Sequence, residues 1–236
     1  MLVHTLFDVL SFICALLTGV SFRRHYALSY PNGIQHDSQH HYYLITLLLG
    51  MVLGSIVLGT LNVYLAGKTG IAKSMLGGIF GAIVAAEIFK YFVGIRQSTG
   101  LYFVPSLIVL IIVGRIGCFL SGLPDFTYGT PTALPWGVDF GDGIARHPVQ
   151  LYESITMTIF LMIFLLSYRG NLLFWNKKGF YVFVLIYAGQ RFLWEFIKPY
   201  PIFFGGLGLF QWLCLVLIGY ALLMLRSTCQ ELKHGE

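Results

Sequence analysis

Apolar runs long enough to cross a lipid bilayer dominate this chain of 236 residues. A helix needs about 20 apolar residues to cross the hydrocarbon core, and in lipid only helices or closed barrels satisfy their own backbone. The chain is 57% hydrophobic and 11% charged, whereas soluble domains carry about a quarter charged residues. The sequence therefore predicts an all-α, polytopic membrane protein in which residues 1–236 form one helical bundle.

We expect seven spanning helices, separated by connections rich in glycine and proline. Their expected ranges are 2–21, 42–66, 74–95, 102–122, 148–168, 179–198 and 206–226. The first run has no basic leader and no small-residue cleavage site, so we expect a retained span rather than a signal peptide.

The distribution of lysine and arginine predicts an outside N-terminus and a cytoplasmic C-terminus, because cytoplasmic loops are enriched in these residues. In this orientation eight of them lie in cytoplasmic segments, four in outer segments and three within spans. The longest connection, about residues 123–147, then faces outward. The net charge of +5 forms no basic stripe, so we expect the lipid bilayer, and no nucleic acid, as a partner.

Four cysteines give no sign of a metal site or a disulfide framework from their spacing. Three lie within apolar runs and one near the C-terminus: Cys14, Cys118, Cys214 and Cys229. The sequence therefore predicts neither a metal nor a cofactor.

Two arginines within the expected spans, Arg115 and Arg191, point to function. A charge at the bilayer centre costs roughly 2.5–3.5 kcal/mol on insertion scales, and a guanidinium does not escape this cost by losing its proton. Glu195 lies one helical turn from Arg191, but Arg115 has no acid within reach on its own span. Its partner must be Glu153, Glu195 or a phosphate. Arginine binds phosphate well through paired N–H groups, and a structural bridge to Glu153 is the alternative.

A second intramembrane pair, Glu87 and Lys90, is three residues apart, and we interpret it as a self-neutralising structural pair. We expect the Lys90 side chain to extend toward a membrane interface. Small residues four apart usually mark close helix packing, although a nearby headgroup would require the same small size. They occur as two pairs, Gly77 with Gly81 and Gly117 with Ser121.

A polar strip opens the fifth expected span, in the sequence Arg146-His147-Pro148-Val149-Gln150-Leu151-Tyr152-Glu153. Proline suits the first turn of a helix. Helical spacing places Gln150 near Glu153, with His147 just ahead of them where the span meets the interface. We interpret the strip as part of a lipid-binding site; the alternative is that His147 is an ordinary surface residue.

These stretches resemble the bacterial prolipoprotein diacylglyceryl transferase family. The family pattern G-R-[IL]-G-N-F-x-N-G-E corresponds to Gly114-Arg115-Ile116-Gly117-Cys118-Phe119-Leu120-Ser121-Gly122, and R-H-P-[ST]-Q-L-Y-E to residues 146–153. An arginine followed by glutamate four residues later resembles Arg191 and Glu195, and a glutamine opening the last span resembles Gln211. The close match covers about thirty residues, and a looser match spans the whole chain.

The resemblance implies transfer of a diacylglyceryl group from phosphatidylglycerol to the lipobox cysteine of a prolipoprotein in the bacterial plasma membrane. The products are a thioether and glycerol phosphate. Fixed cations favour departure of a phosphate ester, and the acceptor thiol must become a thiolate. The expected catalytic residues are Arg115, Arg191 and His147. The expected substrate-binding residues are Arg146, Gln150, Tyr152, Glu153, Glu195, Gly117 and Gly129.

Several positions depart from the family pattern. The family's H-G-G-x-x-G begins here with Leu76, so its histidine is missing. Cys118 and Ser121 replace asparagines, and Leu123 replaces a glutamate for which Asp125 is a candidate substitute. These changes are typical of a divergent branch.

The missing histidine leaves removal of the thiol proton to His147, Glu153, Lys73 or water. Two further functions remain open on the sequence. One is a related lipid transferase with another acceptor or donor. The other is a non-catalytic lipid-binding or transport protein with the same fold.

Overall fold

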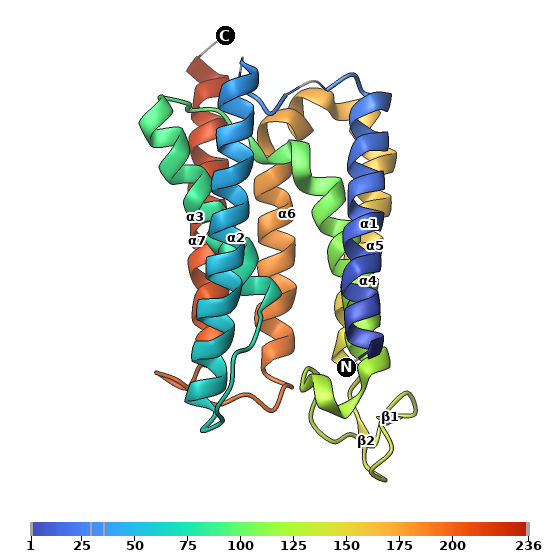
Figure 1. The fold of residues 1–236 in the computed structure, drawn as a ribbon. Helices are drawn as coiled ribbons and strands as arrows, with labels where there is room; N and C mark the ends of the chain where they lie inside the picture. The colour runs from blue at the N-terminus through green and yellow to red at the C-terminus, as the bar shows by residue number, and fades with distance from the viewer. Residues whose placement is uncertain (1, 29, 35, 235–236) are drawn as a thin grey trace.

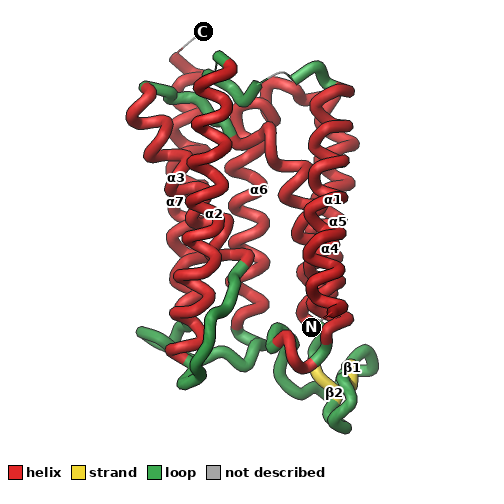
Figure 2. Tube along the Cα trace, viewed as in Figure 1, coloured by secondary structure: helices red, strands yellow, loops and turns green. Residues whose placement is uncertain are grey.

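The computed structural model describes residues 2–28, 30–34 and 36–234, and for residues 2 and 229–234 it describes the backbone alone. The described residues form seven α-helices that run along one common direction (Figures 1 and 2). The helices are α1 (Leu2–His25), α2 (Asp37–Leu65), α3 (Met75–Val93), α4 (Val104–Ser121), α5 (Val149–Tyr168), α6 (Leu172–Glu195) and α7 (Leu209–His234). The predicted all-α membrane bundle is confirmed.

Short elements fill the connections. Three are 3-10 helices: η1 (Gly100–Phe103), η2 (Leu123–Asp125) and η3 (Arg169–Asn171). The connection between α4 and α5 adds an antiparallel pair of two-residue strands, β1 (Val138–Asp139) and β2 (Ala145–Arg146). Residue 2 begins α1 at the same end of the bundle as β1 and β2, and α7 ends at the opposite end (Figure 1). Which end faces the cytoplasm stays a prediction.

Six helical segments of the described chain are long and apolar enough to cross a membrane. One of them, Val149–Glu195, contains both α5 and α6, because η3 joins these helices with little interruption. An ion pair between Glu153 and Arg191 shows that this segment folds back on itself. The prediction of two separate helices in this segment therefore agrees with the structure.

Helix α6 begins well before its expected range, since it runs from Leu172 to Glu195. Gly179 was expected to break the chain there, but it lies inside the helix. A Cβ atom at Gly179 would lie 2.8 Å from Cδ1 of Leu101. The glycine therefore serves close packing, and Lys198 falls in the connection after the helix.

The helices form two groups on either side of α6: α1, α4 and α5 on one side, and α2, α3 and α7 on the other (Figure 1). Glycines allow the closest approaches, since a Cβ at Gly77 would lie 2.5 Å from the carbonyl oxygen of Gly54 on α2. Gly117 lies against Phe7 of α1. The sequence-based interpretation of these small residues as packing positions agrees with this geometry.

The core lies around α5 and α6, where Phe164, Phe183 and Tyr187 have no exposed surface. By contrast, leucines on α1 and α2 such as Leu17 and Leu53 are more than 60% exposed. An apolar outer surface of this kind suits contact with lipid. Most of the buried charged groups, by contrast, lie on or next to α4, α5 and α6.

Candidate active site

Glu153, in the first turns of α5, lies at the centre of a buried group of charges. One carboxylate oxygen lies 2.5 Å from Nε of Arg115 on α4. The other lies 2.5 Å from Nη1 of Arg191 on α6 and 2.6 Å from Nζ of Lys198. Two helices and a connection thus direct three cations onto one carboxylate that has no exposed surface.

Glu195 completes this group, which we call the arginine cluster: Arg115, Glu153, Arg191, Glu195 and Lys198. Its carboxylate lies 2.7 Å from Nη2 of Arg191, as the spacing of four residues predicts, and 3.6 Å from Nζ of Lys198. Each cation contacts a carboxylate, but three cations share two carboxylates, which leaves the cluster with one positive charge in excess. A buried net charge is unfavourable, so the cluster is electrostatically suited to one additional anion.

Lys198 is the member that sequence reasoning missed, because it was counted among the four basic residues of the outer segments. Its side chain is fully buried, since the backbone turns immediately after α6 and the Lys198 N–H donates to the Glu195 carbonyl oxygen at 3.3 Å. Its spacing of three residues from Glu195 was the available signal.

Uncharged polar groups line the same turns of α5 and α6. Among the described residues, both amide atoms of Gln150 and of Gln190 and the hydroxyl of Tyr187 are buried and lack a hydrogen-bond partner. Buried polar groups in proteins are nearly always paired, so such a concentration marks a place built for polar contacts. Gln211 is also buried, and its Oε1 accepts a hydrogen bond from the Gly208 N–H at 2.8 Å.

His147 and Tyr152 lie beside this region rather than within the arginine cluster. Nδ1 of His147 lies 3.3 Å from the Tyr152 hydroxyl, which also accepts a hydrogen bond from Nε1 of Trp136 at 2.9 Å. The Tyr152 ring packs 5.1 Å from the ring of Trp194 on α6. These contacts hold His147 half-buried at the start of α5.

Gly129 has a backbone role in placing His147. Its N–H donates to the His147 carbonyl oxygen at 2.9 Å, and the His147 N–H donates to Thr130 at 3.1 Å. The Thr130 N–H in turn donates to the carbonyl oxygen of Ile197 at 2.7 Å. A Cβ at Gly129 would lie 2.6 Å from Cβ of His147. The glycine thus lets the long connection tie the start of α5 to the end of α6.

Arg146 lies outside the arginine cluster. Its two terminal nitrogens each donate to one oxygen of Asp142 at 2.7 Å. These hydrogen bonds lower the pKa of Asp142 and raise the pKa of Arg146. Its expected role in substrate binding stays a prediction, as does that of Gly117, which contacts Phe7.

An apolar cavity of about 350 Å³ lies elsewhere in the bundle, between α2, α3, α4, α6 and α7. Its polar lining includes Glu87, Lys90 and Tyr220. Nζ of Lys90 donates to the two Glu87 oxygens at 2.8 and 3.1 Å, and the Tyr220 hydroxyl donates to Glu87 at 2.7 Å. The expectation that Lys90 extends to an interface is wrong, because this pairing holds the lysine inside the bundle with 3% exposure.

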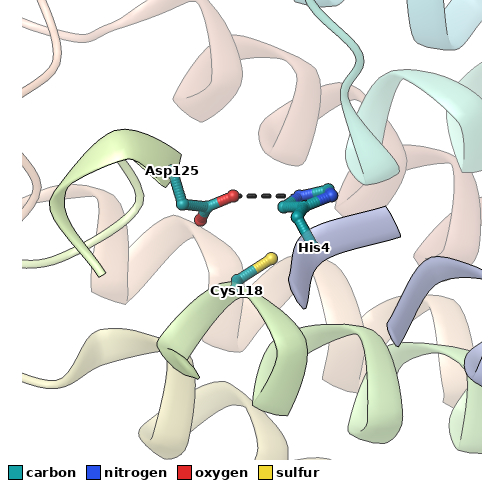
Figure 3. A group of neighbouring side chains, drawn as sticks. All are labelled: His4, Cys118 and Asp125. Carbon is teal, nitrogen blue, oxygen red and sulfur yellow. Dashed lines mark ion pairs between the residues drawn. The ribbon is translucent and has the colours of Figure 1, made fainter. Parts of the chain in front are cut away.

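A further group that the sequence spacing did not reveal joins His4, Cys118 and Asp125 (Figure 3). His4 comes from α1, Cys118 from the last turns of α4 and Asp125 from η2. Sequence reasoning noted Cys118 and Asp125 as departures from the family pattern. It had no signal that would bring His4 to them across more than a hundred residues.

These features define a multi-pass helical membrane protein with a buried, arginine-rich polar site. Residues 4–226 match the family described as prolipoprotein diacylglyceryl transferase. The chain belongs to this family, and the resemblance seen in its motifs is confirmed.

Curated relatives named phosphatidylglycerol–prolipoprotein diacylglyceryl transferase match most of the chain. The protein from Polynucleobacter necessarius is 30% identical over 213 residues, covering 81% of this chain and 79% of the relative. Its counterpart from Polynucleobacter asymbioticus is 34% identical, covering 76% and 75%. The one from Nitratidesulfovibrio vulgaris is 32% identical, covering 82% and 78%. No solved structure matches this chain significantly.

Proposed function

We propose that this protein transfers the diacylglyceryl group of phosphatidylglycerol to the thiol of a prolipoprotein's lipobox cysteine. Membership of the family and the names of its relatives support this reaction. The observation on which the proposal rests is that Arg115 and Arg191, from different helices, meet on Glu153 with one positive charge in excess. The cell location that follows is the bacterial inner membrane.

The phosphate of phosphatidylglycerol carries one negative charge, which balances the excess of the arginine cluster. In the reaction a carbon–sulfur bond forms and the carbon–oxygen bond to the phosphate breaks. The electron pair of that bond leaves with glycerol phosphate, so negative charge grows on the leaving group. Cations already fixed around this position stabilise the transition state more than the ground state.

Glu153 has a positioning role in this scheme. Its two oxygens hold the guanidinium groups of Arg115 and Arg191 near one another, although like charges would repel. Each guanidinium has five N–H donors in a planar fork, so binding Glu153 leaves donors for a phosphate. The polar atoms of Gln150, Gln190 and Tyr187 would face the remaining oxygens of the headgroup.

Of the candidate bases, Glu153 is engaged by three cations and Lys73 is exposed on the connection before α3. His147 is the remaining side chain. It lies at the edge of the site, where Tyr152 orients its ring, and it and water are the two remaining candidate proton acceptors.

The test is direct transfer by the purified full-length chain. Protein in detergent would be incubated with phosphatidylglycerol and a lipobox peptide, and the peptide mass would be followed. We expect an increase by one diacylglyceryl group, with release of glycerol phosphate. A peptide with serine in place of the cysteine should show no increase and serves as the control.

Two results would overturn the proposal. Turnover of lipid with another acceptor, but none with the lipobox cysteine, would indicate a related transferase. Intact lipid under all conditions, despite specific binding of phosphatidylglycerol, would indicate a lipid-binding or transport protein.

A further inference from the structure

Three side chains with metal-binding atoms converge where α1, α4 and η2 meet (Figure 3). One ring nitrogen of His4, the sulfur of Cys118 and one carboxylate oxygen of Asp125 are the three candidate ligand atoms, and they lie within 4.8 Å of one another. Nε2 of His4 lies 3.0 Å from Oδ1 of Asp125. Cys118 points toward the space between the other two side chains.

Neighbouring groups already orient these three side chains. Nδ1 of His4 lies 3.1 Å from a carboxylate oxygen of Asp8, one turn along α1, which leaves Nε2 directed at Asp125. A carboxylate behind the imidazole is the usual second partner of a metal-binding histidine. Thr127 donates to the other oxygen of Asp125, whose side chain is only 6% exposed. The donor set thus has outer partners on both the histidine and the carboxylate.

We propose that His4, Cys118 and Asp125 bind a divalent metal ion of the zinc class. One nitrogen, one sulfur and one oxygen ligand suit zinc, and three protein ligands leave the fourth tetrahedral position open, as in catalytic zinc sites. Zinc bonds of about 2.0–2.3 Å require ligand atoms roughly 3.5 Å apart. Small side-chain rotations that move the ligand atoms by about one ångström would bring them to that spacing.

We further infer that the open position binds the thiol of the acceptor cysteine, an inference that rests on the proposed transferase function. A thiol bound to zinc loses its proton, here to water, because His4 is 40% exposed. The bound thiolate then attacks the glyceryl carbon and forms the carbon–sulfur bond. The carbon–oxygen bond breaks, and its electron pair leaves on glycerol phosphate. The neutral thioether is a weaker ligand and is released.

The position of the metal site relative to the arginine cluster supports this role. Nη1 of Arg115 lies 3.9 Å from Sγ of Cys118, one turn further along α4. Arg115 therefore lies between the place for the acceptor thiolate and the place for the phosphate. In the lipid the reacting carbon is bonded to the phosphate ester oxygen, so the thiolate and the phosphate must bind close together. The metal site and the arginine cluster are neighbours, as this reaction requires.

The proposal also accounts for two departures from the family pattern. Leu76 stands where the family has a histidine, and it is 1% exposed in the apolar core. Cys118 replaces an asparagine and adds the sulfur ligand. A metal that ionises the acceptor thiol would make a side-chain base at the position of Leu76 unnecessary.

The first test measures metal binding without any reference to activity. Full-length protein in detergent would be stripped with a chelator, loaded with Zn²⁺ or Co²⁺, and analysed by elemental analysis and absorption spectroscopy. We expect about one ion per chain and, with Co²⁺, a thiolate-to-metal charge-transfer band in the near ultraviolet. Cys118→Ser should abolish the band, and Asp125→Asn should lower metal affinity strongly.

The controls use variants away from the three ligands. Cys14→Ser removes a thiol on α1 and should leave the band unchanged. Asp8→Asn should weaken metal binding by roughly 10–100-fold without abolishing it, because it removes only the outer partner of His4. Normal elution of each variant as a folded protein on size exclusion is required. A stripped protein that binds neither ion, or that keeps the full band in Cys118→Ser, would overturn the metal site.

The second test concerns the acceptor thiol. Adding a lipobox peptide to the Co²⁺ protein should strengthen the charge-transfer band, whereas the serine peptide should not. Chelation should stop diacylglyceryl transfer, and Zn²⁺ should restore it. Full transfer by metal-free protein would overturn this inference and leave the proposed function intact. Metal binding without transfer by the loaded protein would instead refute the proposed function and keep the metal site.

Discussion

Two groups of buried charge occur in this bundle, and they differ in how they are assembled. Glu87 and Lys90 lie on one helix, neutralise each other, and gain a third bond from Tyr220. The arginine cluster joins α4, α5, α6 and the connection after α6, and it keeps one positive charge in excess. Lys90 and the members of the arginine cluster are all buried, but only the arginine cluster is electrostatically incomplete.

The comparison shows which property separates a structural ion pair from a candidate binding site. Intramembrane charge alone does not, since Lys90 is as buried as Arg191. What differs is the balance of charge and the number of partnerless polar atoms nearby, such as those of Gln150 and Gln190. A charge imbalance maintained by four separate elements is costly to fold, so a ligand-binding role is the simplest reason for it.

Glu153→Gln should produce the largest change, since it leaves three buried cations facing Glu195 alone. Breaking a buried ion pair from one side typically costs about 3–5 kcal/mol. Glu87→Gln should lower the free energy of unfolding less, because Glu87 is 35% exposed and an unpaired lysine can release its proton, unlike an arginine. Unfolding of both variants in detergent would measure the difference. Equal losses would remove the distinction between the two groups.

Arg115→Lys should reduce transfer sharply while the protein stays folded. An ammonium keeps the charge but cannot form the planar fork, and losing one oriented donor at a developing anion typically costs about 10²–10³-fold in kcat. Lys90→Arg, the matched exchange in the neutral pair, should leave kcat within a few-fold. The measurement is peptide lipidation rate at saturating phosphatidylglycerol. Near-normal turnover of Arg115→Lys would argue against phosphate binding there.

His147→Ala should have a smaller effect if a bound metal ionises the acceptor thiol. A general base contributes typically 10²–10⁴-fold, whereas we expect a loss below about tenfold from the disturbed contact with Tyr152. The dependence of rate on pH should keep its shape. Loss of one limb of that profile would assign proton removal to His147 and count against the metal.

The sequence predicted the local part of this picture well. Hydrophobic runs located every helix, although α6 begins before and α7 ends after its expected range, and the spacing of four residues predicted the contact between Arg191 and Glu195. Glu153 was correctly included among three possible partners of Arg115. These inferences succeed because they depend on helix periodicity or on the high cost of an unpaired charge in lipid.

The contacts that the sequence did not predict depend on how the helices pack and on how the connections between them turn. Lys198 joins the arginine cluster only because α6 ends at Glu195 and the backbone turns inward. His4 meets Cys118 and Asp125 only because α1 packs on α4, with Phe7 against Gly117. No local pattern specifies which helices become neighbours, so these contacts required the fold.

The smallest expected effect concerns the ion pair between Asp142 and Arg146, which lies in the connection between α4 and α5. Arg146 lowers the pKa of Asp142, so the pair is complete above the ordinary carboxyl value of about 4 and is lost as pH falls through the lowered value. Asp142→Asn should therefore lower the thermal midpoint only slightly at pH 7, and the difference from the natural protein should vanish in strong acid. Transfer activity at pH 7 should be unchanged, because exposed ion pairs contribute little and Arg146 is not in the arginine cluster. A large loss of activity in Asp142→Asn would show that this connection, and with it the expected substrate-binding role of Arg146, belongs to the site after all.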